Sequence, residues 1–198
     1  MPANDLEWNE LLNVARKQLV LPLVVDGLEG LPENLRPSVK VVMGIAEEIE
    51  RTEVDNHVIN ALSMKIKHYF EKKGLHPIIQ KGAVIAAYYP IPTHRQTGDI
   101  DIFLKADEWR KGCDFIWNEY YVGDEHGLRI SYAKMSSDDS LCFVLDGRTV
   151  ELHNRFYDSR YEFLALDKHG PEAHIAMMSA PALKHCLGSG IRMKQLCD

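Results

Sequence analysis

Apolar residues recur at helical spacing through the first third of the chain. Residues 5 to 20 predict an amphipathic helix with Asp5 as its N-cap. Its apolar stripe consists of Leu6, Trp8, Leu11, Leu12, Ala15 and Leu19. A loop is expected next, at Pro22, Gly27, Gly30 and Pro32. A second helical pattern runs from Pro37 to about Lys73, where Gly74 ends it. Its candidate core positions are Val41, Ile45, Ile49, Val58, Leu62, Ile66, Tyr69 and Phe70. We expect both helices to act as scaffold.

Strand patterns dominate the middle of the chain. The predicted order is a strand at 76–80, a Lys81-Gly82 turn, a helix at 83–89, a loop at 90–97, a strand at 98–104 and a helix at 107–120. Three further strands are expected at 128–134, 141–145 and 149–153. The last two are joined at Asp146-Gly147, which is a hairpin turn signal. From about Tyr161 the pattern is helical again.

This order of elements predicts an α+β fold in three parts. Residues 1–74 form an N-terminal helical scaffold, residues 75–160 a mixed sheet with flanking helices, and residues 161–198 a C-terminal helical segment. Leu196-Cys197-Asp198 ends the chain within an apolar periodic pattern, without a capping glycine. We therefore expect this chain to be a truncated form whose parent contributes further helices.

The strand at 98–104 carries two carboxylates on one face. Side chains alternate along a strand, so Asp99 and Asp101 point one way while Ile100 and Ile102 point into a core. Positions two residues apart lie about 6.5 to 7 Å from each other along the strand. Both carboxylates can therefore reach one hard cation or a pair of them. The alternative is an ordinary edge strand whose charges block pairing with other chains.

Glu151 repeats this pattern on a later strand. It shares a face with Thr149 and His153, while Val150 and Leu152 occupy the apolar face. A third carboxylate near the first two would complete a metal site. A solvent-facing glutamate would have the same pattern.

The Lys81-Gly82 turn between a strand and a helix predicts a phosphate-binding site. The free N–H groups and positive dipole at a helix start favour anions, and Lys81 would add a mobile cation. An ordinary tight connection would have the same sequence. Arg95, four residues before Asp99, would bind a substrate phosphate or pair with a carboxylate.

Composition excludes several classes of protein. A net charge of −6 argues against general DNA or RNA binding, which needs a basic surface. The apolar run from Leu19 to Val25 is too short to cross a membrane and contains Pro22. The four cysteines lack metal-ligand spacing, so we expect buried thiols, no zinc and a cytoplasmic location.

Taken together, these motifs resemble the DNA polymerase β-type nucleotidyltransferase superfamily. Lys81-Gly82, Tyr89-Pro90, Arg95, Gly98-Asp99-Ile100-Asp101 and Glu151-Leu152-His153 are similar to bacterial nucleotidyltransferases of largely unknown substrate. The resemblance covers about residues 76 to 198. Ala83 departs from it, because the family's turn usually has serine or glycine after the first glycine.

The resemblance implies a specific activity and a specific set of site residues. The enzyme would transfer a nucleoside monophosphate from a nucleoside triphosphate, ATP among the candidates, to an acceptor hydroxyl, with two Mg²⁺ (or Mn²⁺) ions. Asp99, Asp101 and Glu151 would be the metal ligands and catalytic residues. The nucleotide-binding residues would be Lys81, Gly82, Arg95, Gly98, Lys184 and Arg192.

Two alternatives to this activity stay open at this point. One is a catalytically silent nucleotide- or partner-binding module on the same fold. The other is a nucleotide-sugar glycosyltransferase, which also uses Asp-x-Asp but needs a nucleotide-binding α/β half upstream, where this chain has helices. The acceptor is equally open, since a protein, an RNA end or a small molecule would all supply a hydroxyl.

Overall fold

A computed structural model describes Pro2, residues 4–122 and 128–155, and the single residues Ile175, Met178, Ser179, Lys194 and Cys197. Lys184 and Arg192 lie outside the described residues. The same is true of nearly all of the segment 161–198, including the helical pattern at the chain end.

The N-terminal part contains three helices, and two of its expected details were wrong. Helix α1 (Asp5–Lys17) is capped by Asn4, whose side chain accepts a hydrogen bond from the Glu7 N–H. Asp5 instead accepts hydrogen bonds from the N–H and the hydroxyl of Ser38, the N-cap of the third helix. Helix α2 (Leu21–Asp26) takes the place of the first part of the expected loop, because Pro22 lies in its first turn, where no backbone N–H is needed. Two short 3-10 helices follow, η1 (Gly27–Gly30) and η2 (Glu33–Leu35).

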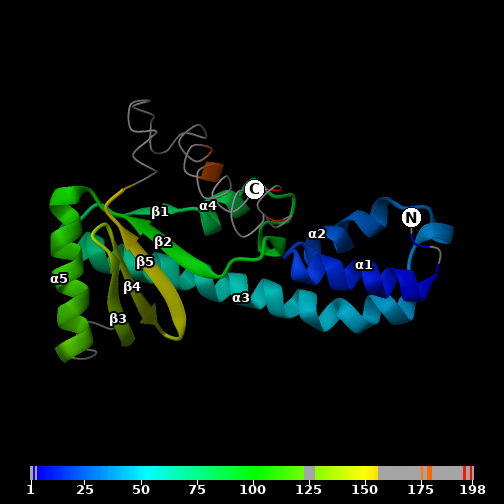
Figure 1. Cartoon of the computed structure of the whole chain (residues 1–198), viewed down its shortest axis with the longest axis horizontal. Coiled ribbons are helices and arrows are strands. Elements are labelled where there is room, and N and C mark those ends of the chain that lie inside the picture. Colours follow the sequence, from blue (N-terminus) through cyan, green and yellow to red (C-terminus); the bar gives the residue numbers. More distant parts are fainter. Residues whose placement is uncertain are drawn as a thin grey trace.

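Helix α3 (Val39–Lys72) has 34 residues and takes part in two hydrophobic cores. Its first half shares a core with α1 and α2. In Figure 1, α1 lies alongside α3, and α2 lies on the other side of α1. Its second half packs against the sheet. Val58 was wrongly expected in the core, since it is 40% exposed while Ile59 is 1% exposed. In α1, Leu6 and Leu11 are likewise exposed. Gly74, with φ of +77°, follows the helix end.

The remaining elements build one five-stranded sheet with helices between its strands. They are β1 (Ile78–Gln80), α4 (Gly82–Ala86), η3 (Pro92–His94), β2 (Asp99–Phe103), α5 (Ala106–Val122), β3 (Ile130–Ser137), β4 (Ser140–Leu145) and β5 (Arg148–His153). The strand order is β1-β2-β5-β4-β3, with β2 and β5 parallel and every other pair antiparallel. This mixed sheet flanked by helices confirms the predicted α+β fold.

One face of the sheet packs against α3 and α5, and the apolar residues of β2 and β5 lie on this face, as their alternation predicted. Ile100 and Ile102 of β2, and Val150 and Leu152 of β5, are buried in a core shared with both helices. In Figure 1, α3 passes behind the sheet and α5 lies at its left end. The opposite face of β2 and β5 therefore carries the acidic residues.

The Asp146-Gly147 hairpin between β4 and β5 is confirmed. Both residues have positive φ, +47° and +81°, as a type I′ turn requires. The Asp146 carboxylate also bonds outward, with Lys65 Nζ at 3.1 Å and Arg129 Nε at 3.0 Å. These contacts connect the turn to α3 and to the segment before β3.

Two side chains of α3 hold the loop that leads into β2. The buried Asn56 donates from Nδ2 to the carbonyls of Thr93 and Arg95. His94 lies between two carboxylates, with Nδ1 2.7 Å from Asp26 and Nε2 3.0 Å from Glu53. The loop is thus attached to both α2 and α3.

The domain boundaries at residues 74 and 160 stay a prediction, and α3 contributes to the cores on both sides of the first. Among the described residues, no helix is both long enough and apolar enough to cross a membrane.

We predict that Asn56→Leu lowers the free energy of unfolding by about 1 to 3 kcal/mol, because it removes two buried hydrogen bonds to the loop. Urea unfolding measures this change. Asn60→Leu, at an exposed position of the same helix, should stay within about 0.5 kcal/mol of the wild type. Equal effects of the two substitutions would contradict a loop-holding role for Asn56.

His94 should make stability depend on pH. Burial alone would lower its pKa, but hydrogen bonds to Asp26 and Glu53 outweigh burial and raise the pKa. The stabilisation from protonated His94 is therefore complete below its unfolded pKa of about 6.5 and is lost as pH rises through the higher folded value. We expect the stability difference between wild type and His94→Asn to shrink over that window. His68→Asn, at an exposed site on α3, is the control, and a difference that stays constant with pH would contradict the prediction.

Candidate functional site

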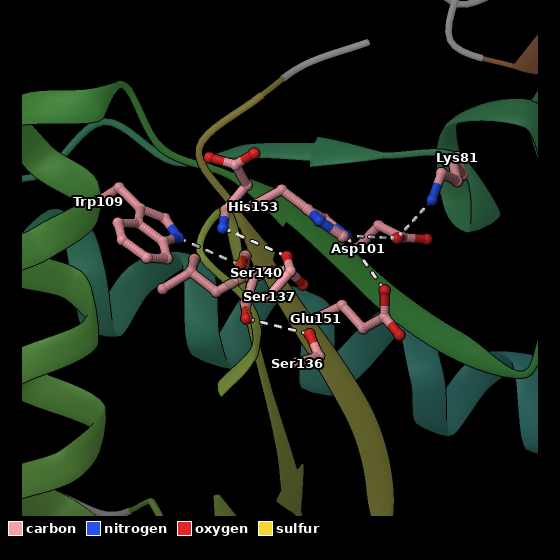
Figure 2. A network of polar contacts seen from close by, with 10 residues as sticks. Lys81, Asp101, Trp109, Ser136, Ser137, Ser140, Glu151 and His153 are labelled. Carbon is pink, nitrogen blue, oxygen red and sulfur yellow. Dashed lines mark hydrogen bonds and ion pairs between the residues drawn. The ribbon is translucent and has the colours of Figure 1, made fainter. Parts of the chain in front are cut away.

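The parallel pairing of β2 and β5 brings the predicted acidic residues together. In this register Asp101 is opposite Glu151, and Phe103 is opposite His153. Residues opposite each other in a sheet share a face, so the carboxylates of the two strands point to the same side. Figure 2 shows Asp101 and Glu151 extending from neighbouring strands toward one another.

His153 lies between these two carboxylates. Its Nε2 is 3.0 Å from Asp101 Oδ1 and 3.3 Å from Glu151 Oε2. One ligand atom from each of the three residues lies within 4.8 Å of the other two. Strand alternation predicted that His153 shares a face with Glu151, but no role was predicted for it. Its spacing of two residues from Glu151 was the signal that could have identified it as part of the site.

Lys81 contacts the same carboxylate from the other side. Its Nζ lies 2.7 Å from Asp101 Oδ1, the oxygen that His153 also contacts. Lys81 has φ of +46° and ψ of −118°, an uncommon backbone conformation for a residue with a side chain. The turn between β1 and α4 imposes this conformation and directs the ammonium to Asp101, as Figure 2 shows.

Gly82 lies in a closely packed part of the turn. A Cβ at this position would lie 2.9 Å from Thr97 Cγ2, closer than real Cβ contacts allow. The turn therefore lies against the end of the loop that enters β2. Gly98, in contrast, has open space where a Cβ would be, so its part in nucleotide binding stays a prediction.

Asp99 begins β2 and is exposed, unlike Asp101. It is outside the group of three ligand atoms formed by Asp101, Glu151 and His153. Although Asp99 is exposed, protein atoms around its carboxylate remove part of its hydration and so raise its pKa. The negative charges of Asp101 and Glu151 raise this pKa further, against the effect of Lys81. Asp99 is thus near enough to interact electrostatically with the other carboxylates.

Hydrogen bonds keep the two central carboxylates ionised. Burial alone would raise the pKa of Asp101, but His153 and Lys81 together lower it. The hydrogen bond from His153 lowers the pKa of Glu151. Burial favours neutral His153, yet its bonds to Asp101 and Glu151 raise its pKa. The site therefore combines carboxylate anions with an imidazole and an ammonium group.

Arg95 is buried in the loop before β2. Its Nη1 donates to the Thr97 hydroxyl at 3.2 Å, so the guanidinium contributes to the loop conformation. We expected a substrate phosphate or a carboxylate as the partner of Arg95, and the contact with Thr97 does not distinguish between the two. Lys184 and Arg192, the two remaining cations proposed for the nucleotide, are not among the described residues.

Trp109 of α5 fixes the strand that carries Glu151 and His153. Its indole N–H donates to the Leu152 carbonyl at 3.2 Å, in the buried part of the structure (Figure 2). The His153 carbonyl accepts from the Leu104 N–H at 2.9 Å. The strand end is therefore held by a helix on one face and by the end of β2 at its side.

The donor atoms of this site fit a divalent cation. Asp101 and Glu151 are ionised carboxylates from two rigid strands, and the neutral form of His153 would offer a nitrogen. Carboxylate oxygens suit Mg²⁺ and Mn²⁺, while imidazole suits softer divalent ions.

A mixed sheet with carboxylates on two parallel strands and a lysine turn beside them is the arrangement expected of a nucleotidyltransferase. Residues 4–198 match a protein family described as uncharacterised nucleotidyltransferase, and the chain belongs to this family. Its class is therefore that of transferases, and the resemblance seen in the sequence is confirmed. Comparisons with curated proteins and with solved structures gave no match.

We predict that Trp109→Phe preserves most of the ring packing but lowers the free energy of unfolding by about 1 to 3 kcal/mol. The reason is that the Leu152 carbonyl loses a buried hydrogen-bond donor. Trp117→Phe, on the same helix and only partly buried, is the matched control. Chemical denaturation of both variants measures the change, and a larger loss for Trp117→Phe would exclude the proposed strand-fixing role.

Proposed function

We propose that this protein transfers a nucleoside monophosphate from a nucleoside triphosphate to an acceptor hydroxyl, with Mg²⁺ or Mn²⁺ ions held by Asp99, Asp101 and Glu151. The observation that carries the proposal is the parallel register of Asp101 with Glu151. It puts a carboxylate from a second strand next to the Asp-x-Asp pair. Two metal ions about 4 Å apart need this kind of convergent set of carboxylates.

The reaction would proceed as an in-line substitution at the α-phosphorus. The acceptor oxygen forms the new bond to this phosphorus, and the bond from it to the β-phosphate bridging oxygen breaks, so that pyrophosphate leaves with the electron pair. When bound, the metal ions supply charge neutralisation and lower the pKa of the acceptor hydroxyl. Glu151, kept ionised by His153, would assist removal of the hydroxyl proton.

Nucleotide binding in this proposal involves the turn and loop on the β1 side of the acidic pair. Lys81 and Gly82 would hold the β- and γ-phosphates, and Arg95 and Gly98 would lie along the nucleotide. The Lys81 side chain is 30% exposed, so it can reach a ligand from its present position. Lys184 and Arg192 stay candidates for the same task.

The acceptor remains to be identified, and a protein, an RNA end and a small molecule are the three classes to test. We also propose a cytoplasmic location, supported by thiols without disulfide partners at Cys113, Cys142 and Cys197. A screen of nucleoside triphosphates against acceptor mixtures, read as a mass increase of one nucleotide, would identify the donor and the acceptor together.

We predict that Asp101→Asn reduces turnover at least about 100-fold, because it removes a charge that would hold the metal ions and stabilise the transition state. Release of labelled pyrophosphate from a γ-labelled nucleotide with Mg²⁺ measures it. Asp107→Asn, at an exposed position in the first turn of α5, should retain wild-type turnover. Binding of nucleotide by the wild type with no turnover for any acceptor would favour the catalytically silent alternative.

A further inference from the structure

Lys81 and His153 both contact a single oxygen of the buried carboxylate in the site. Asp101 Oδ1 is 2.7 Å from Lys81 Nζ and 3.0 Å from His153 Nε2. Asp101 itself is only 2% exposed. A divalent cation that uses this carboxylate therefore meets positive charge within a few ångströms. Because like charges at such distances repel strongly away from bulk water, metal binding and these contacts oppose each other.

We propose that Lys81 is an internal counter-ion of the metal site, which competes with the divalent cation for Asp101 and moves to the phosphates when the nucleotide binds. This inference rests on the proposed function, and it adds to it a coupling between metal binding and nucleotide binding. Metal alone would bind weakly, because the ammonium occupies its ligand. Metal and nucleotide together would bind strongly, because the phosphates give the ammonium a new partner.

Lys81 is better suited than His153 to move away from Asp101 when a metal ion and nucleotide bind. A protonated amine has no lone pair for a metal, whereas imidazole can lose its proton and become a ligand. The Lys81 side chain is 30% exposed, against 19% for His153. Its flexible four-carbon stem also allows the ammonium to move while its backbone stays in place.

The backbone of Lys81 gives a second, independent reason to assign it a role. Its positive φ costs free energy in any residue except glycine, and such a conformation persists where the surrounding structure imposes it. Here Gly82 packs against Thr97, and Gln80 pairs with Asp101 in the β1–β2 register. The strained turn thus holds the base of the lysine side chain directly beside the carboxylate.

Competition of this kind predicts opposite effects on two binding constants. Removal of the Lys81 charge should strengthen the binding of metal alone and weaken the binding of the metal–nucleotide complex. A lysine that only supports the fold would, when replaced, weaken both. By linkage, the affinity that nucleotide adds to the metal equals the affinity that metal adds to the nucleotide.

The first experiment measures Mn²⁺ binding without nucleotide, by titration calorimetry and by the Mn²⁺ electron paramagnetic resonance signal. Lys81→Met should bind Mn²⁺ about five- to tenfold more tightly than the wild type. Lys81→Arg, which keeps the charge, should bind it no more tightly than the wild type. Lys65→Met is the matched control, since Lys65 pairs with Asp146 away from the site, and it should leave the Mn²⁺ affinity unchanged.

The second experiment uses Mn²⁺ with a non-hydrolysable nucleoside triphosphate analogue. Lys81→Met should bind this complex about tenfold more weakly than the wild type, on the scale of one lost hydrogen bond to a charged group. Thermal melting of every variant checks folding. If Lys81→Met does not fold, Lys81→Gln provides the same neutral test.

The outcomes separate this inference from the proposed function. Mn²⁺ binding to the wild type that Asp101→Asn leaves unchanged, or no Mn²⁺ binding either alone or with the nucleotide analogue, would overturn both. Asp101-dependent Mn²⁺ binding that Lys81→Met weakens or leaves unchanged would overturn the counter-ion role alone. Tighter Mn²⁺ binding together with weaker nucleotide binding in Lys81→Met would support it.

Discussion

The burial of Asp101 is the constraint on which the rest of the site depends. An ionised carboxylate that is 2% exposed is stable only beside opposite charge and hydrogen-bond donors. Lys81 and His153 supply these groups from two different elements. The β1–α4 turn and the end of β5 must therefore both lie in their observed places for this carboxylate to be charged. The same two contacts therefore determine both the local fold and the charge distribution of the site.

Parallel pairing of β2 and β5 is what brings Glu151 to the same place. Parallel neighbours need a long connection, and here α5 and the antiparallel β3–β4 pair provide it. The connection also has a direct effect on the site, because Trp109 of α5 donates to β5 between Glu151 and His153. A helix that only covered the sheet would not fix the strand in this way. One side chain, Trp109, therefore contributes both to the core and to the geometry of the candidate site.

Local periodicity explains which features could be predicted from the sequence. The faces of β2 and β5 follow from alternation alone, and the Asp146-Gly147 turn follows from its two residue types. Pairing between distant elements is not encoded locally, so neither the contact of Lys81 with Asp101 nor the part played by His153 was predicted. The same limit explains why Val58 was expected in the core, since only tertiary packing distinguishes it from Ile59.

The two aspartates of the Asp-x-Asp pair differ in a way that their spacing does not suggest. Asp101 is buried and its pKa is lowered by two cations, whereas Asp99 is exposed and its pKa is raised, first by desolvation and then by Asp101. In the proposed function, a cation that binds Asp99 would relieve unfavourable negative charge there. To bind Asp101 as well, it would have to displace the Lys81 ammonium. With Lys81 in the proposed counter-ion role, the strand would offer one carboxylate that favours metal binding and one that resists it until Lys81 moves.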